Sequence, residues 1–424
     1  MVPPETAAAK PVADPALQAR ITVILKAHGF AGAGVCVYDL SSARLLYARQ
    51  ARRALLPASN EKLITAATAL AEWGAGYRFT TDLDTSGTID ADGVYRGRIY
   101  LKGYGDPSLS TVGYQSYTLH LKTAALSGFV TALKHVGVKK IAGRIVGDDS
   151  YFDALRAVSV WKPSVSDDCG PLSALSLNEG IEPNGGFTTD PPLFAATRLT
   201  ALLRHSGIPV SGGPRVGATP STAKLVYSEH SPPLAAILAL MNKSSDNFFA
   251  EMLTKGLGAA FGGAGSTAAG TKVERAFLVS EGIAPQSFAV TDGSGLSYAD
   301  RETPLAITQL LTAMAMRSDW PVFWRSLSVA GVSGTLADRM RGTIAQRNVH
   351  GKTGTLAVAS SLSGYVKSAN GEWLAFSILM NRRPIDVAAA QAAQDAIGVA
   401  LAHSRPAGTV VWTPSPAASA VPRW

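Results

Sequence analysis

Three short stretches of this chain bring hydroxyl groups together with lysine or amide side chains. They read "PASNEKL", "KSSDNFF" and "HGKTGTL" and begin at residues 57, 243 and 350. Their chemically relevant residues are, in chain order, Ser59 and Lys62, Ser245 and Asn247, and Lys352, Thr353 and Gly354. A hydroxyl becomes an effective nucleophile only when a neighbouring base removes its proton. The sequence therefore raises the question of covalent catalysis by a serine.

The first stretch has a structural and a catalytic interpretation. Ser59 opens a predicted helix, and serine is a favoured N-cap. A capping box needs Glu or Gln three residues after the cap, but Lys62 occupies that place, where a cation also opposes the helix dipole. Residues i and i+3 share a helix face, so Lys62 reaches the Ser59 hydroxyl and, if neutral, acts as its base. A single Ser-x-x-Lys match is common by chance and leaves both interpretations open.

The second stretch, Ser245-Asp246-Asn247, lies at a predicted helix junction. The structural interpretation is a helix cap, because all three residue types are favoured there. In the functional interpretation, the Ser245 hydroxyl relays a proton to a leaving group and the Asn247 amide binds a substrate backbone.

The third stretch, Lys352-Thr353-Gly354, is flanked by glycine on a predicted strand. A phosphate-binding loop would need glycine five residues before Gly351, and Gln346 occupies that position, which excludes this interpretation. A cation and a hydroxyl on a strand with small residues suit the capture of a carboxylate beside an extended peptide.

Several elements must position these residues. A buried helix is predicted from Ser59 to about Trp73, because its residues are apolar or small nearly all round. Two strands, 33–40 and 44–50, precede it, and a helical pattern covers 16–28. Near the C-terminal end, residues 360–381 predict a hairpin, with Asn370-Gly371 as a two-residue turn of positive φ, followed by a helix over 384–403.

The distribution of predicted strands and glycine-rich segments along the chain indicates its domain organisation. Strands occur near both ends and a β-rich, glycine-rich region lies between them. We expect one α/β (α+β) domain built from 16–80 and 226–404, interrupted by a mainly-β insertion at 81–225 with two small subdomains, about 81–155 and 156–225. Residues 1–15 are predicted to be flexible and 405–424 to form an irregular tail.

The amino-acid composition indicates some classes of protein and excludes others. The chain has 424 residues, 46% hydrophobic and 17% charged, which is typical of a folded globular protein of more than one domain. The net charge of +8 comes from scattered basic residues without interleaved aromatics, so nucleic-acid binding is not predicted. No apolar run is long enough to span a membrane. Cys36 and Cys169 show no metal-ligand spacing, no metal or cofactor site is predicted, and whether these cysteines pair is left open.

The order Ser-x-x-Lys, Ser-x-Asn, Lys-Thr-Gly resembles that of penicillin-binding proteins and serine β-lactamases. The gap of 186 residues from Ser59 to Ser245 is too large for a compact β-lactamase. It resembles the D-alanyl-D-alanine carboxypeptidase/endopeptidase family, the low-molecular-mass class C penicillin-binding proteins. The stretches "LKGYGDPSLS", "GPLSALSLNEG" and "TDGSGLS" also resemble this family, so the similarity covers about residues 16 to 403.

The resemblance implies a penicillin-binding, transpeptidase-like fold with an antiparallel sheet between helices. It implies a serine DD-peptidase that acts on peptidoglycan stem peptides ending in D-Ala-D-Ala, needs no cofactor, and is acylated by β-lactams. Ser59 would attack, Lys62 would be the base, Ser245 would pass the proton on, and Asn247 would hold the substrate backbone. Lys352, Thr353 and Thr355 would bind the terminal carboxylate, and the N–H groups of Ser59 and Thr355 would form the oxyanion hole.

The resemblance also implies two stem-peptide contacts, with Asp148 or Asp149 and with Arg301. Family members often carry arginine directly after "SGLS", where this chain has Tyr298. Two alternatives stay open, a β-lactamase-type hydrolase and a non-catalytic peptidoglycan-binding paralogue. The first 20 residues lack the apolar segment of a secretory signal. Since the substrate that the resemblance implies is peptidoglycan, we expect an exported protein of the periplasm or cell envelope whose signal has been removed.

Overall fold

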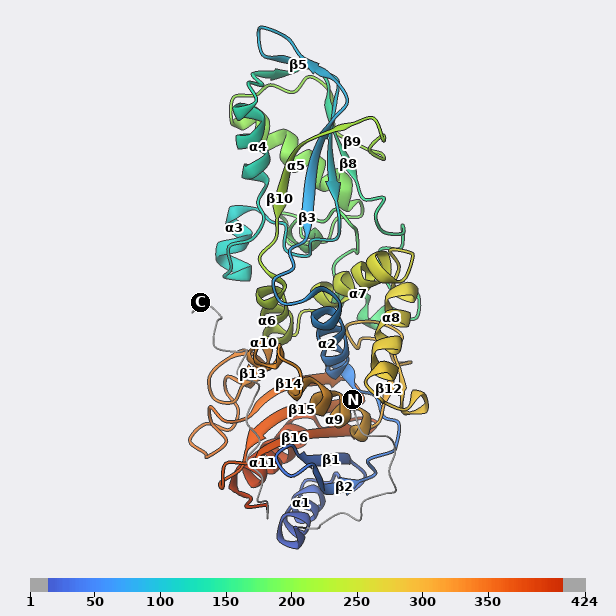
Figure 1. Cartoon of the computed structure of the whole chain (residues 1–424), viewed down its shortest axis with the longest axis vertical. Coiled ribbons are helices and arrows are strands. Elements are labelled where there is room, and N and C mark those ends of the chain that lie inside the picture. The colour runs from blue at the N-terminus through green and yellow to red at the C-terminus, as the bar shows by residue number, and fades with distance from the viewer. Residues whose placement is uncertain (1–13, 407–424) are drawn as a thin grey trace. The chain divides into compact units, whose positions relative to one another are not determined.

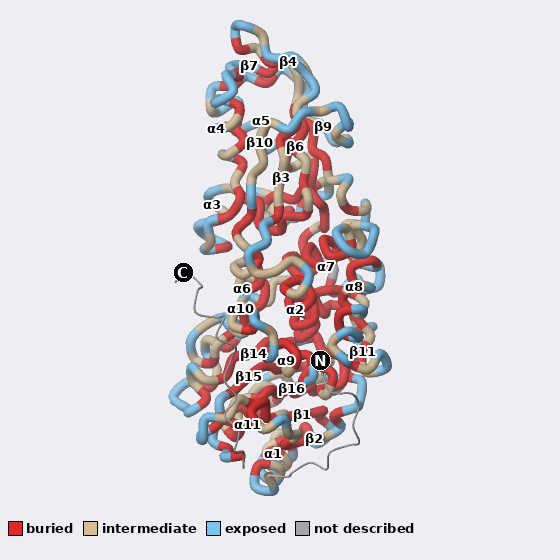
Figure 2. Tube along the Cα trace, in the orientation of Figure 1, coloured by how far each residue is buried: buried red, intermediate tan, exposed pale blue. Residues whose placement is uncertain are grey.

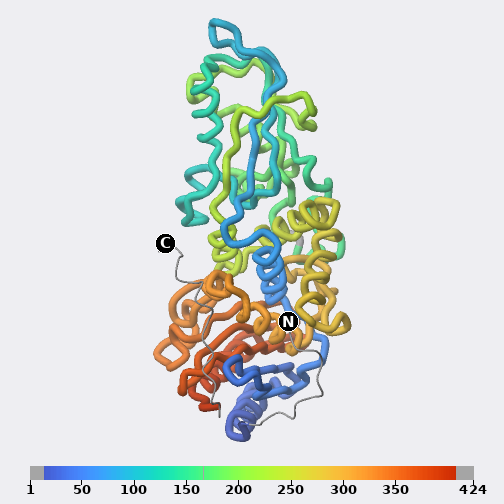
Figure 3. The backbone as a smooth tube through the Cα atoms, viewed as in Figure 1, coloured from blue at the N-terminus to red at the C-terminus, as the bar shows by residue number. Residues whose placement is uncertain are grey.

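The computed structural model describes residues 14–406, which form two compact units. Unit 1 contains the described residues of 1–75, 238–247 and 271–424, and unit 2 contains 76–237 and 248–270. Figure 3 shows the blue N-terminal strands beside the orange and red C-terminal strands in unit 1. Most of the tail predicted at 405–424 and of the flexible segment predicted at 1–15 lies outside the described residues.

Unit 1 is built on a six-stranded sheet in which every neighbouring pair is antiparallel (Figure 1). In spatial order its strands are β13 (Ser328–Val329), β14 (His350–Leu356), β15 (Ala359–Lys367), β16 (Trp373–Asn381), β1 (Gly34–Asp39) and β2 (Arg44–Arg49). The first and last parts of the chain therefore share one sheet, and the antiparallel sheet expected for this domain is confirmed.

Helices cover both faces of this sheet. Leu362 and Val366 of β15 pack into the same core as α1 (Pro15–Ala27) and α11 (Val387–His403). Tyr365 points to the opposite face, where its hydroxyl donates to the Leu311 carbonyl oxygen of α9 (Pro304–Ala315) at 2.8 Å. Since alternate residues of a strand face opposite sides, β15 is buried on both.

The remaining elements of unit 1 surround the predicted motifs. A 3₁₀ turn, η1 (Ala58–Glu61), leads directly into α2 (Lys62–Trp73), whose first nine residues are all buried, as the red tube in Figure 2 shows. The others are α6 (Leu234–Ser244), α8 (Thr267–Ser280), α10 (Trp320–Ser326), β11 (Phe288–Ala289), β12 (Arg301–Glu302) and the 3₁₀ turns η5 (Pro285–Ser287) and η6 (Gly334–Leu336). Both α6 and α8 begin in unit 2 and end in unit 1.

The β15–β16 hairpin forms, but its turn differs from the expected one. Ser368 and Glu372 are joined by a hydrogen bond, so three residues form the loop. Gly371 has φ +91°, whereas Asn370 is not among the residues with positive φ. The Gly371 amide donates to the Ser368 carbonyl, as in a type I turn followed by a left-handed glycine. Only one position of positive φ is needed, and glycine supplies it.

Unit 2 contains a mixed five-stranded sheet packed against α4 (Leu126–His135) and α5 (Pro191–His205). Its strands, in order, are β10 (Lys224–His230), β3 (Thr80–Thr85), β6 (Arg98–Gly103), β8 (Arg144–Asp148) and β9 (Arg215–Val216). The other elements are the small sheet of β4 (Thr88–Ile89), β5 (Val94–Arg96) and β7 (Lys140–Ile141), with α3 (Val112–Tyr114), η2 (Gln115–Leu119), η3 (Pro163–Asp168), η4 (Asn178–Gly180) and most of α7 (Asn247–Phe261).

Unit 2 includes the whole of 81–225 and, in addition, 76–80, 226–237 and Phe248–Gly270, which the sequence placed with the other domain. The further division of 81–225 into two subdomains stays a prediction. Cys36 is buried on β1, and the buried Cys169 thiol donates to the Gly170 carbonyl oxygen. Both cysteines keep thiols and form no disulfide with each other.

Candidate active site

Ser59 lies on the 3₁₀ turn η1, with its side chain partly exposed. The turn starts at Ala58, whose φ of +50° is unusual for a residue with a side chain. The helix α2 begins only at Lys62, its N-cap position is Glu61, and no side chain caps it. The N-cap interpretation of Ser59 is therefore wrong, and its hydroxyl is available for other contacts.

Lys62 is completely buried at the start of α2. Its Nζ donates to Ser59 Oγ at 3.0 Å, to Asn247 Oδ1 at 2.7 Å and to the carbonyl oxygen of Ser294 at 2.6 Å. A lysine with three fixed acceptors in a water-poor place has one defined position, and that position is within hydrogen-bond distance of the serine hydroxyl.

Ser245 and Asn247 lie at the junction of α6 and α7. Ser245 has φ +61°, a left-handed conformation that costs a residue with a Cβ about 1 kcal/mol or more. The Asp246 amide closes the bend by donating to the Met241 carbonyl oxygen at 2.9 Å. The bend places the Ser245 hydroxyl 2.8 Å from Nζ of Lys352, which donates to it.

Lys352 is also completely buried, on β14. Burial first, and then the positive charge of Lys62, hold the pKa of Lys352 well below its usual value of 10.5. Its Nζ donates to Ser245 and to the Thr353 carbonyl oxygen at 2.9 Å, so a second lysine lies against the second serine.

Gly354 allows β14 to approach the serine turn. A Cβ at this position would lie 2.8 Å from the Ser59 backbone nitrogen, 2.8 Å from the Pro57 carbonyl oxygen and 2.3 Å from Ser361 Oγ. Since real Cβ atoms do not come so close to backbone, only glycine fits. On the same strand Thr355 is exposed, and Thr353 Oγ1 donates to Thr335 Oγ1 at 2.7 Å.

The structure thus brings all three motifs together within unit 1. Hydrogen bonds link Ser59, Lys62 and Asn247 in one group and Ser245 and Lys352 in another, and Asn60 Nδ2 joins the serine turn to the Lys352 carbonyl oxygen at 2.8 Å. Thr353, Gly354 and Thr355 extend along the same strand.

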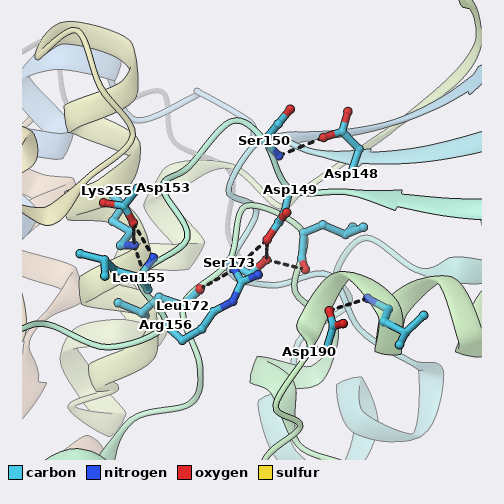
Figure 4. Close-up of polar contacts among 12 residues, drawn as sticks. Asp148, Asp149, Ser150, Asp153, Leu155, Arg156, Leu172, Ser173, Asp190 and Lys255 are labelled. Atoms are coloured by element: carbon cyan, nitrogen blue, oxygen red, sulfur yellow. Dashed lines mark hydrogen bonds and ion pairs between the residues drawn. The ribbon is translucent and has the colours of Figure 1, made fainter. Parts of the chain in front are cut away.

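Asp148 belongs to unit 2, whereas the three motifs belong to unit 1. Its carboxylate accepts from the backbone amides of Ser150 at 2.9 Å and Thr219 at 2.7 Å. Burial acts to raise the pKa of Asp148, but hydrogen bonds from the side chains and amides of Thr219 and Ser150 outweigh it and leave the pKa below its usual value. Figure 4 shows Asp148 bonded to Ser150, and Asp149 turned to Arg156, its partner in a 2.7 Å ion pair, and to Ser173.

Arg301 lies on β12 in unit 1 and is exposed. Its guanidinium donates to the carbonyl oxygens of Tyr298 at 2.9 Å and Asp300 at 2.6 Å. The roles of Asp148 and Arg301 toward a stem peptide stay predictions.

Sequence reasoning assigned no role to several groups that the fold brings to the site. These are the Asn60 amide, the Ser294 carbonyl oxygen, the Thr335 hydroxyl and four buried acids, Glu61, Asp292, Asp300 and Glu302. One signal was present, a glutamate beside a lysine at the start of an otherwise apolar helix. Among residues 14–406, no three His, Cys, Asp or Glu side chains are arranged to hold a metal ion, and no helix has the length and apolar character of a membrane span.

The chain matches the model of the D-Ala-D-Ala carboxypeptidase 3 (S13) family over residues 17–184 and 186–404. It belongs to that family. It is a serine peptidase of the carboxypeptidase type, and the resemblance inferred from the three motifs is confirmed. A D-alanyl-D-alanine carboxypeptidase from Actinomadura sp. (strain R39) is 30% identical to this chain, in a gapped alignment that covers 92% of this chain and 86% of the relative.

Solved structures show the same fold. Penicillin binding protein 4 from Haemophilus influenzae superposes with a TM-score of 0.73 at 22% identity, covering 85% of this chain and 95% of the other. A predatory peptidoglycan endopeptidase from Bdellovibrio bacteriovorus superposes with a TM-score of 0.58 at 19% identity, covering 90% and 96%. The penicillin-binding, transpeptidase-like fold predicted from the motifs is therefore confirmed.

Proposed function

We propose that this protein is a serine DD-peptidase that removes the terminal D-alanine from peptidoglycan stem peptides and also cleaves cross-links between them. The observation that carries the proposal is the 3.0 Å hydrogen bond from Lys62 Nζ to Ser59 Oγ, in a group that includes Asn247. A buried amine held against a serine hydroxyl is the arrangement that nucleophilic acyl transfer requires.

Acylation begins when Ser59 Oγ attacks the carbonyl carbon of the penultimate D-alanine. In its neutral form Lys62 keeps its two N–H donors for Asn247 and Ser294, accepts a hydrogen bond from the Ser59 hydroxyl and takes that proton as the C–O bond forms. Complete burial makes the charged form of this amine costly. The backbone N–H groups of Ser59 and Thr355 stabilise the oxyanion, and the close approach of Gly354 to the Ser59 nitrogen supports this assignment.

The C–N bond then breaks and the departing D-alanine amine takes up the proton, which Ser245 passes on. Lys352 supplies positive potential at Ser245, 2.8 Å away. Asn247 aligns the substrate backbone, and Lys352, Thr353 and Thr355 bind the terminal carboxylate. Water hydrolyses the Ser59 ester and releases the shortened peptide. A β-lactam acylates the same serine, and the complex of a β-lactam with the Haemophilus protein supports this expectation.

Substrate chemistry supports the remaining assignments. An enzyme acting on peptidoglycan works outside the cytoplasm, so we propose a periplasmic or cell-envelope location. The fold shared with an enzyme described as a peptidoglycan endopeptidase supports cleavage of cross-links. Asp148, or Asp149, and Arg301 are proposed contacts of the stem peptide.

The test is covalent labelling by a fluorescent penicillin followed by mass spectrometry of the labelled peptide. We expect one adduct, on Ser59, and release of D-alanine from a pentapeptide that stops in Ser59→Ala. D-Alanine release by Ser59→Ala at the wild-type rate would refute the mechanism. Rapid loss of the label would favour a β-lactamase, and absence of both label and product would favour a non-catalytic binding protein. Cross-linked muropeptides, digested in parallel, test the endopeptidase activity.

A further inference from the structure

Four carboxyl groups lie buried beside the serine turn in unit 1. Glu61 is the last residue of η1, two residues after Ser59, and Asp292, Asp300 and Glu302 come from the "TDGSGLSYADRE" segment. All four side chains are fully buried. The proposed reaction uses none of them, so their burial calls for another explanation.

Two of the four have donors from the backbone. Asp292 accepts from the amides of Gly295 at 2.7 Å and Ser297 at 2.8 Å. Asp300 Oδ1 accepts from the amide and the hydroxyl of Thr291 at 2.8 and 2.6 Å. These contacts hold the segment in its folded conformation.

Glu61 and Glu302 are different. None of their four carboxyl oxygens has an N–H or O–H donor among the described residues, and the two side chains lie within hydrogen-bond distance of each other. Two ionised carboxylates only accept hydrogen bonds, and their like charges repel at such a separation. The pair is therefore stable in this position only with a proton between its oxygens.

The backbone on either side of the pair is tightly connected. Glu302, on β12, exchanges two hydrogen bonds of 2.9 Å with Leu55, four residues before Ser59. Gly295, at φ +80°, lies so close that a Cβ there would be 2.0 Å from the Ala58 carbonyl oxygen and 3.0 Å from Glu61 Cβ. On its other side the turn is joined to β14 through Asn60. A change in the separation of Glu61 and Glu302 must therefore move the turn that carries Ser59.

We propose that Glu61 and Glu302 form a proton-sharing clamp that positions the Ser59 turn, and that acylation requires the clamp to keep its proton. The inference rests on the proposed function in taking Ser59 as the nucleophile. Glu61 and Glu302 act as positioning residues, since neither touches the reacting atoms.

The charges around the pair give the direction of its pH dependence. Burial first, and then the acids Glu302, Asp300 and Asp292, raise the pKa of Glu61 well above 4.5. Burial raises the pKa of Glu302 to about 7, the Glu61 hydrogen bond opposes this, and Asp292 adds to it. The adjacent cation on α2 is Lys62, whose amine is directed to Ser59, Asn247 and Ser294.

A carboxyl group with a raised pKa binds its proton more tightly in the folded state than in the unfolded state. The stability that Glu302 contributes is therefore fully present below its ordinary pKa of 4.5 and is lost as pH rises through about 7. When both carboxyl groups have lost their protons, the two carboxylates repel each other.

The decisive variant is Glu61→Gln, because the glutamine amide donates to the Glu302 carboxylate at every pH. Once the pair loses its proton, we expect the limiting acylation rate constant of the wild type at saturating penicillin to fall about tenfold per pH unit. Glu61→Gln should lose most of this alkaline decrease while it still acylates near neutral pH. Glu302→Gln should behave in the same way with the donor reversed. Glu72→Gln, on the exposed side of α2, is the matched control and should keep the wild-type profile.

A pH profile of Glu61→Gln identical to that of the wild type would overturn the clamp. A second measurement does not depend on catalysis, namely the melting temperature as a function of pH in Ser59→Ala. Its decrease as pH rises through about 7 should be reduced by about half or more when Glu61→Gln is added. An unchanged slope would overturn the clamp even if penicillin labels Ser59. Absence of wild-type labelling at every pH would instead overturn the proposed function.

Discussion

At the scale of single residues, the site depends on two buried lysines in contact with two serines. Lys62 donates to Ser59 and Lys352 donates to Ser245, and both amines are fully buried. Desolvation and mutual repulsion make the charge of such amines more costly than at the surface. The two roles proposed for them need opposite states, a neutral Lys62 that takes a proton and a charged Lys352 that binds a carboxylate.

The lowered pKa of Lys352 leads to a prediction about substrate binding. A cation with a depressed pKa loses its charge at lower pH than a free lysine, so carboxylate binding should weaken well below pH 10.5. We expect KM for a D-Ala-D-Ala peptide to rise through an inflection below that value, with a smaller effect on kcat. The measurement is initial D-alanine release across pH, with a peptide methyl ester, which lacks the carboxylate, as control. Parallel rises in KM for both substrates would contradict the assignment.

The contact between the buried acids Glu61 and Glu302 could not be predicted by considering each residue separately. In the sequence, Glu61 adjoins Lys62, and Glu302 lies 241 residues later. The bridge between Leu55 and Glu302 and the close packing of Gly295 on Ala58 and Glu61 bring the two together. No spacing rule connects positions so far apart, so sequence reasoning missed them.

At the scale of elements, the site forms where the 3₁₀ turn η1, the junction of α6 and α7, and the strand β14 come together. The close approach of β14 to η1 depends on Gly354, and the bend between α6 and α7 depends on a left-handed Ser245. Strained or crowded backbone of this kind persists only where the surrounding structure holds it. These elements provide the spacing that the three motifs need.

Gly354→Ala tests this close approach. Its Cβ would lie 2.8 Å from backbone atoms of Ser59 and Pro57, so β14 or the turn must shift. We expect a loss of about 1–3 kcal/mol in the free energy of unfolding and a marked decrease in the penicillin acylation rate. Denaturant unfolding and stopped-flow acylation measure the two effects. Gly32→Ala is the control, because nothing lies within 4 Å of a Cβ there, and wild-type acylation by Gly354→Ala would exclude the crowding argument.

At the scale of the whole molecule, the chain makes two compact units, and all of the catalytic residues proposed here belong to unit 1. Unit 2 has its own hydrophobic core and its own buried polar contacts. One of these is the 2.6 Å ion pair of Lys255 with Asp153, in which the lysine also donates to the Leu155 carbonyl oxygen at 2.7 Å (Figure 4).

Lys255→Met should therefore lower the stability of unit 2 and leave the acylation of Ser59 in unit 1 nearly unchanged. It leaves the Asp153 carboxylate and the Leu155 carbonyl oxygen without their buried donor, but Asp153 is 31% exposed, so we expect a loss of about 2 kcal/mol in stability. Acylation of Ser59 at a temperature where the variant is folded should stay close to the wild-type rate. Hydrogen exchange resolved by segment and penicillin labelling provide the two measurements. The exposed Lys272→Met serves as control, and loss of labelling without unfolding would show that unit 2 contributes to the site.

The sequence by itself determined the three motifs and, through their resemblance to a known family, the family and its antiparallel sheet; the insertion stays a prediction. The motifs follow from local residue types and from their order, which the chain displays directly. The tertiary structure decided that Ser59 lies on a 3₁₀ turn and not at a helix cap, that Phe248–Gly270 packs with unit 2, and that Glu61 meets Glu302. Contacts between residues far apart in the chain depend on packing and burial, and neither can be read from spacing alone.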